Sequence, residues 1–105
     1  MAQNFRIDWK TQVIIATSTS DASATIPNDT VGNFPNTNFG SWWLMGVSGT
    51  PAYINAGAAA TSANALHPVG RDDTPKWIPP GTVMHALTAT GTGQVFFIRC
   101  YLTNV

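Results

Sequence analysis

The 105-residue chain has the length of one domain, and its charge is unusually low. Charged residues make up 10% of it, against roughly 25% in a typical soluble domain, and glutamate is absent. The formal net charge is zero and the few Lys and Arg residues are scattered, which argues against electrostatic binding of nucleic acid. The single cysteine, Cys100, excludes an intrachain disulfide.

Four Trp, five Phe, nine Gly and seven Pro in a Thr-rich chain are typical of β-strands joined by turns. We therefore expect an all-β fold, either a small antiparallel β-sandwich or a jelly-roll-like barrel. The first residues lack the basic and then apolar stretch of a secretory signal, and no apolar run approaches the roughly 20 residues of a membrane helix. The sequence thus predicts a protein that is made in the cytoplasm and contacts no membrane.

Along the chain, residues 5–10 alternate apolar and polar side chains and predict a strand. Residues 13–16 continue it or form a second strand, with a register break expected near residues 10–12. Residues 17–41 are polar, lack periodicity and contain Pro, Asn and Gly, which favour turns. This segment holds either short strands that the pattern does not reveal or an extended arm. We accordingly divide the single domain into an N-terminal strand and polar arm, residues 1–41, and a β-sandwich core, residues 42–105.

The second part of the chain predicts two hairpins. Residues 42–47 are a short apolar run, typical of a buried strand, and residues 52–55 form the returning strand after a Ser-Gly-Thr-Pro turn. Residues 58–75 predict a loop with at most one helical turn, because they lack an apolar stripe. After a short strand at 76–78, strands at 82–90 and 94–102 flank a Gly-Thr-Gly turn and predict the second hairpin.

The last strand, residues 94–102, is largely apolar on both faces, one formed by its odd-numbered and one by its even-numbered residues. One face fits the interior of a sandwich. We expect another copy of the chain to cover the other, and we predict a homo-oligomer, with a trimer as the expected form.

Three turn-bearing segments in the second part carry a family resemblance. They are Tyr53-Ile54-Asn55-Ala56-Gly57, Trp77-Ile78-Pro79-Pro80-Gly81 and Ala89-Thr90-Gly91-Thr92-Gly93-Gln94-Val95. With them, residues 42–102 resemble a small virion module of tailed phages and prophages. The resemblance implies a β-sandwich that coats capsids or sits on tails and fibres, and it implies no catalytic residues.

The residues that commonly carry chemistry are few. His67 with Asp72 and Asp73 suggests a metal site, but their spacing fits no known metal loop and a solvated turn is expected. His85 and Cys100 lie on strands predicted to be adjacent, yet nothing supplies an oxyanion hole. We therefore predict no catalytic residue, no metal and no cofactor.

Together with low charge, two apolar strand faces and the polar N-terminal segment, the resemblance implies a capsid decoration or cement protein that binds the major capsid protein on the outer surface of a phage head and stabilises it. Two alternatives stay open: a tail, fibre or head-fibre component that contacts glycans through tryptophans, and a non-viral β-sandwich binding module. The residues expected to contact a partner or another copy are aromatic. They are Phe34, Phe39, Trp42, Trp43, Trp77, Phe97 and Tyr101.

Overall fold

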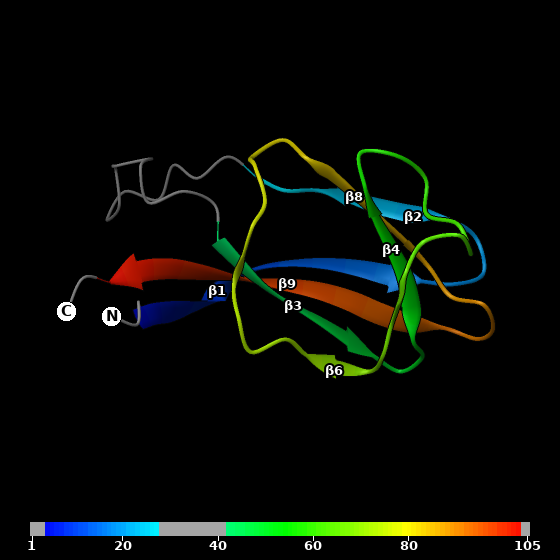
Figure 1. The fold of residues 1–105 in the computed structure, drawn as a ribbon, viewed down its shortest axis with the longest axis horizontal. Coiled ribbons are helices and arrows are strands. Elements are labelled where there is room, and N and C mark those ends of the chain that lie inside the picture. Colours follow the sequence, from blue (N-terminus) through cyan, green and yellow to red (C-terminus); the bar gives the residue numbers. More distant parts are fainter. Residues whose placement is uncertain (1–3, 28–41, 104–105) are drawn as a thin grey trace.

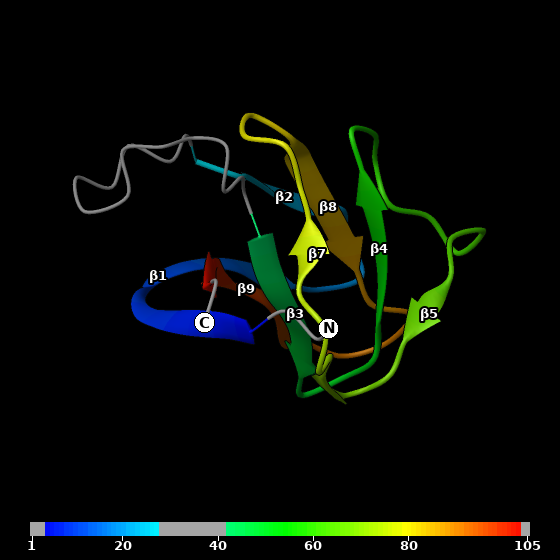
Figure 2. The same ribbon diagram turned by 60° about the vertical axis from the view of Figure 1, so that its left-hand side comes forward.

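The computed structural model describes residues 4–27 and 42–103, and these contain nine strands in two antiparallel sheets. Figures 1 and 2 show the sheets as two layers, with β1, β9 and β3 side by side in one of them. The all-β prediction is confirmed, in the form of the sandwich. No helix in the described part is long and apolar enough to cross a membrane.

The larger sheet has five strands. In spatial order they are β1 (Asn4–Thr17), β9 (Gly93–Thr103), β3 (Trp42–Ser48) and β6 (Gly70–Arg71), with β7 (Lys76–Trp77) also paired to β3. The second sheet has four strands. They are β2 (Ala22–Thr25), β8 (Val83–Leu87), β4 (Ala52–Ala56) and β5 (Leu66–His67).

The predicted register break in β1 is confirmed. Asp8 lies opposite Arg99 and Gln12 opposite Ile98, so residues 9–11 bulge out of the ladder. The Asp8 carboxylate organises the bulge by accepting hydrogen bonds from the backbone N–H of Lys10 (3.0 Å) and the hydroxyl of residue 11 (2.7 Å). One continuous strand therefore contains both predicted N-terminal pieces.

Both predicted hairpins are wrong. β3 and β4 belong to different sheets, as do β8 and β9, so each short turn carries the chain from one layer to the other. The reason is that the long β9 pairs along both of its edges, with β1 and with β3. The two crossovers pack together at one end of the sandwich, where the Thr50 hydroxyl donates to the carbonyl of Thr92 at 2.8 Å. Gly49, at φ 84°, allows this close approach, because a Cβ there would lie 2.9 Å from the Cα of Gly93.

The main core lies between the sheets and is built from side chains of both inner faces. Its buried members are Ile15, Ile26, Trp43, Met45, Val47, Ala52, Ile78, Met84, Ala86, Val95 and Phe97. Arg99 is also buried, and its guanidinium lies over the ring of Trp43, 5.5 Å from the centroid. The odd-numbered face of the last strand is therefore the interior one, a choice that the two-sided apolar pattern had left open.

The N-terminal segment takes part in this core. β2 pairs with β8, and Ile26 beyond it is fully buried and donates its backbone N–H to Thr82 at 2.8 Å. The short-strand interpretation thus holds for residues 22–25. Residues 28–41, which include the predicted anchors Phe34 and Phe39, lie outside the described residues. The loop prediction for residues 58–75 holds for residues 58–65, with one turn closed by Asn64 N–H to the Thr61 carbonyl (3.0 Å). It is wrong at β5 and β6, because two-residue strands are formed by pairing with β4 and β3 and show no side-chain periodicity of their own.

Candidate functional site

The side of the five-stranded sheet that faces away from the main core, here called the outer face, carries the candidate site. Side chains of residues directly opposite in a sheet point to the same side, so the register identifies its members. Trp42 lies opposite Cys100 and Trp77, and Gly46 lies opposite Phe96 and Arg71. The even-numbered residues of β3 and β9 therefore share this face with residues of the short edge strands.

The centre of the outer face is a second, smaller core. Leu44, Ile98 and Cys100 are buried there, and Ile7, Trp42 and Phe96 pack against them. Cys100 has no exposed surface, and this burial raises the pKa of its thiol. The centre of the second apolar face, which the sequence assigned to a neighbouring copy, is thus shielded by the chain's own side chains. The homo-oligomer itself stays a prediction.

Trp9 and Arg71 meet above this smaller core. The Arg71 guanidinium carbon lies 5.9 Å from the centroid of the Trp9 ring, within cation–π range. Their strands, β1 and β6, stand at opposite edges of the sheet, separated by β9 and β3, which corresponds to about 14 Å of sheet width. The main core fills the inner side, so the two side chains reach each other over the outer face. The β1 bulge makes this possible, because it releases Trp9 from the regular ladder.

Trp42 and Trp77 form the other aromatic contact of the outer face. They are direct cross-strand neighbours on β3 and β7, with ring centroids 5.8 Å apart and an interplanar angle of 66°. Such edge-to-face pairs contribute about 0.5–1.5 kcal/mol beyond their buried area. Trp77 nevertheless remains 49% exposed and Trp9 59% exposed. We call Trp9, Trp42, Trp77 and Arg71 the aromatic rim.

The structure sorts the predicted contact residues into three groups. Trp42 and Trp77 lie in the aromatic rim, while Trp43 and Phe97 are fully buried in the main core and therefore serve the fold. Phe34 and Phe39 lie outside the described residues, as does the side chain of Tyr101.

Sequence reasoning missed Trp9 and Arg71 as members of the site. The alternation over residues 5–10 placed Trp9 on a regular strand face. The expected register break near residues 10–12 was the one signal that could have singled it out. No local signal marks Arg71, because its contact with Trp9 depends on how the strands are ordered in the sheet.

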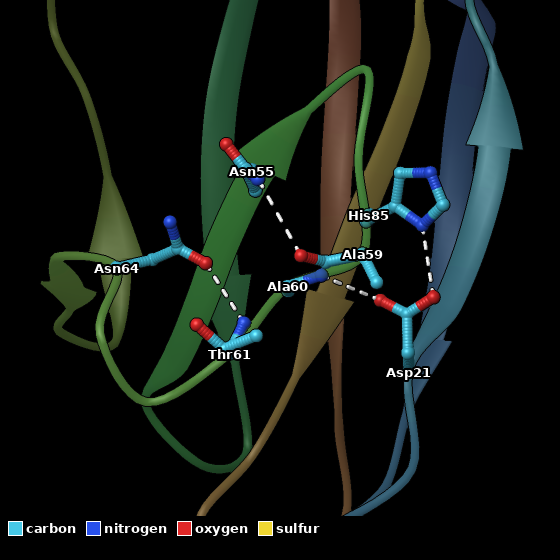
Figure 3. Close-up of polar contacts among 7 residues, drawn as sticks. All are labelled: Asp21, Asn55, Ala59, Ala60, Thr61, Asn64 and His85. Atoms are coloured by element: carbon cyan, nitrogen blue, oxygen red, sulfur yellow. Dashed lines mark hydrogen bonds and ion pairs between the residues drawn. The ribbon is translucent and has the colours of Figure 1, made fainter.

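A polar cluster lies on the other sheet (Figure 3). Asp21 accepts a hydrogen bond from the backbone N–H of Ala60 (2.8 Å), and its other oxygen lies 2.8 Å from Nδ1 of His85. The Ala60 bond first, and the His85 contact second, hold the pKa of Asp21 below its ordinary value. Asp21 lies in the connection between β1 and β2, and Ala60 lies in the loop after β4. The hydrogen bond between them therefore attaches this loop to the four-stranded sheet.

The predicted adjacency of the strands that carry His85 and Cys100 is wrong, because β8 and β9 belong to different sheets. Met84 and Ala86 point into the main core, so His85 between them faces the outside of the four-stranded sheet. Cys100 faces the outside of the five-stranded sheet. The two residues therefore lie on opposite sides of the sandwich.

The segment around His67 forms a hollow of about 150 Å³ beside β3, with Arg71 and Asp72 in its wall. Asp72 forms an ion pair with Lys76 at 3.3 Å. Within the part of the chain that the structure describes, no group of three or more His, Cys, Asp or Glu side chains could hold a metal ion.

No family model matches the chain, and neither the curated proteins nor the solved structures include a significant match. The resemblance to phage virion modules thus stays a prediction.

Proposed function

We propose that this protein is a structural binding module that docks on a protein surface through the outer face of its five-stranded sheet. In its specific form, the proposal is a decoration or cement protein on the outside of a phage head. The observation that carries the docking role is the aromatic rim, in which Trp9 and Trp77 remain about half exposed on the same face as a buried apolar centre.

The chemistry of the rim suits a protein partner. Trp and Arg are the residue types that most often dominate binding energy at protein–protein interfaces, and Lys and Glu are depleted there. Removing the exposed half of a Trp side chain from water buries on the order of 100 Å² and stabilises a complex by roughly 2.5 kcal/mol before association costs. Trp9 and Trp77 both retain about this much exposed surface.

The phage head is the specific surface for two reasons taken from the sequence. Three turn-bearing segments resemble those of small virion modules, and 10% charge offers little repulsion between copies crowded on a shell. The proposed mechanism is passive, because contact area between the module and the shell protein stiffens the particle.

The proposal assigns no catalysis to the chain. The thiol of Cys100 is buried with a raised pKa, away from any solvent-facing nucleophile position. His85 and Asp21 are engaged in holding a loop. These roles are structural, and they support the non-enzymatic proposal.

A second candidate is a tail, fibre or head-fibre component that contacts glycans. The Trp42–Trp77 pair favours it, because the half-exposed indole of Trp77 offers a flat face on which a sugar ring can stack. Saturable quenching of tryptophan fluorescence by an oligosaccharide, lost in Trp77→Ala, would favour this candidate over the protein surface.

Two measurements test the proposal. Quantitative mass spectrometry of gradient-purified particles from the source gives the copy number of this chain relative to the shell protein. Hundreds of copies per particle support a coat role, a handful move the protein to the tail, and absence removes the virion role.

Binding of purified variants to particles stripped of this chain then tests the rim. We expect Trp77→Ala to raise the Kd at least tenfold, whereas Leu66→Ala, an equally exposed residue on the other sheet (52%), leaves it unchanged. Equal affinity of the two variants would exclude the rim as the docking surface.

A further inference from the structure

The outer edge of β1 is the longest open sheet edge in the described part of the chain. β1 pairs with β9 on one side, and no other described strand pairs with it. The remaining edge strands have only two to four residues each. A short edge strand offers few backbone groups for pairing with another chain, which is a common protection against such pairing. β1, with 14 residues, lacks this protection.

The second half of β1 also lacks the charges that usually protect an edge. After the bulge, residues 12–17 are paired without interruption to residues 98–93 of β9. No charged residue occurs from Thr11 to Ser20. Ile14 is 51% exposed on the outer face, beside the exposed side chains of Gln12 and Ala16. This stretch therefore presents a regular, uncharged and partly apolar edge.

We propose that two copies of the chain pair antiparallel along residues 12–16 of β1, which joins their five-stranded sheets into one continuous sheet about a two-fold axis. Residues directly opposite in a sheet point to the same side, whereas neighbours along one strand point to opposite sides. An axis between two neighbouring residues would set them opposite each other, so the axis must pass through a residue. An axis at Ile14 brings this side chain against Ile14 of the partner subunit. Val13 then lies opposite Ile15 of the partner subunit, on the core side.

The alternative axis at Ile15 fits less well. It would centre the contact on Ile15, whose side chain is already buried in the main core, and would leave the exposed Ile14 opposite Ala16 of the partner subunit. An axis at Ile14 instead buries the exposed Ile14 against its own copy. The paired residues, 12–16, carry no charged side chain, so no like charges meet.

This pairing gives a dimer where the sequence patterns predicted a trimer. A two-fold axis perpendicular to the joined sheet keeps both outer faces on the same side, so the dimer presents two aromatic rims to one surface. Trp42, Trp77 and Arg71 stand on strands far from the paired edge and stay accessible. The inference does not depend on the nature of the docking partner, and its test needs only the purified chain.

Site-specific cross-linking tests the register. Ile14→Cys places two thiols directly across the axis, within the Cα separation of about 4.4–6.8 Å that a disulfide needs. Ala16→Cys is the matched control on the same edge and face, and its two thiols would lie about 14 Å apart along the joined strands. We expect a disulfide-linked dimer on mild oxidation for Ile14→Cys only. Equal cross-linking of both variants, or none of either, would overturn the register.

Analytical ultracentrifugation of the unmodified chain tests the assembly. We expect a dimer whose dissociation constant rises at least tenfold in Ile14→Lys, since two lysines would face each other across the axis. Val69→Lys adds the same charge at an equally exposed residue (52%) away from β1 and should leave the dimer intact. A monomer or a trimer, or equal weakening by both variants, would refute the proposal. Circular dichroism confirms that each variant keeps its fold.

Discussion

Gly46 on β3 provides the sharpest test of how the outer face is packed. The ring of Phe96, on the neighbouring strand β9, lies directly over it. A Cβ at this position would lie 2.9 Å from Cε1 of the ring, with Cζ and Cε2 closer still. Favourable carbon–carbon contacts are about 3.5–4.0 Å, so the ring would have to move by roughly 1 Å or more. Phe96 would then lose its contact with the smaller core of Leu44, Ile98 and Cys100.

We expect Gly46→Ala to lower the free energy of unfolding by about 1–3 kcal/mol, the usual range for an overpacked buried site. Urea denaturation of Gly46→Ala, Phe96→Leu and the double variant measures the coupling between the two residues. Because leucine lacks the ring atoms that cause the clash, Gly46→Ala should cost less than about 0.5 kcal/mol in the Phe96→Leu background. An equal cost in both backgrounds, or no cost in either, would refute the packing that we describe.

Two further outcomes are expected from buried or paired polar groups. The Thr17 hydroxyl is buried without a hydrogen-bond partner among the described residues. Thr17→Val removes this unsatisfied group and should raise the free energy of unfolding by about 1 kcal/mol in the same denaturation assay. A lower free energy of unfolding would contradict this prediction. The folded pKa of Asp21 is lowered, so its contribution to stability is present above the unfolded pKa and is lost as the pH falls through the folded value. Asp21→Asn should therefore show a weaker loss of stability below about pH 4 than the unchanged chain, and an equal loss in the two proteins would contradict this.

Much of the local structure follows from short-range patterns. Alternation identified the strand at residues 5–10, and the polar interruption after it placed the bulge that Asp8 organises. The apolar run at residues 42–47 and the two-sided apolar pattern of residues 94–102 marked the two strands with buried residues on both faces. These predictions succeed because side-chain periodicity and turn chemistry act over a few neighbouring residues.

Strand pairing was beyond the reach of those patterns. A short Gly-containing turn fits a hairpin and a crossover equally well, and the chain uses crossovers at residues 49–51 and 88–92. Whether such a turn makes a hairpin or a crossover depends on the whole set of strands. Between β1 and β3, β9 forms backbone hydrogen bonds along both of its edges, which satisfies more of its N–H and C=O groups than pairing with β8 alone would.

The candidate site, like the fold, could be predicted only in part from the sequence. Its tryptophans are visible in the sequence, and low charge with two apolar strand faces already indicated that one face would need shielding. Only the tertiary structure separated Trp42 and Trp77, which line the outer face, from Trp43, which fills the core. It also brought Trp9 to Arg71 across two intervening strands. Periodicity determines that successive side chains alternate between faces, but which face is enclosed depends on how the two sheets stack.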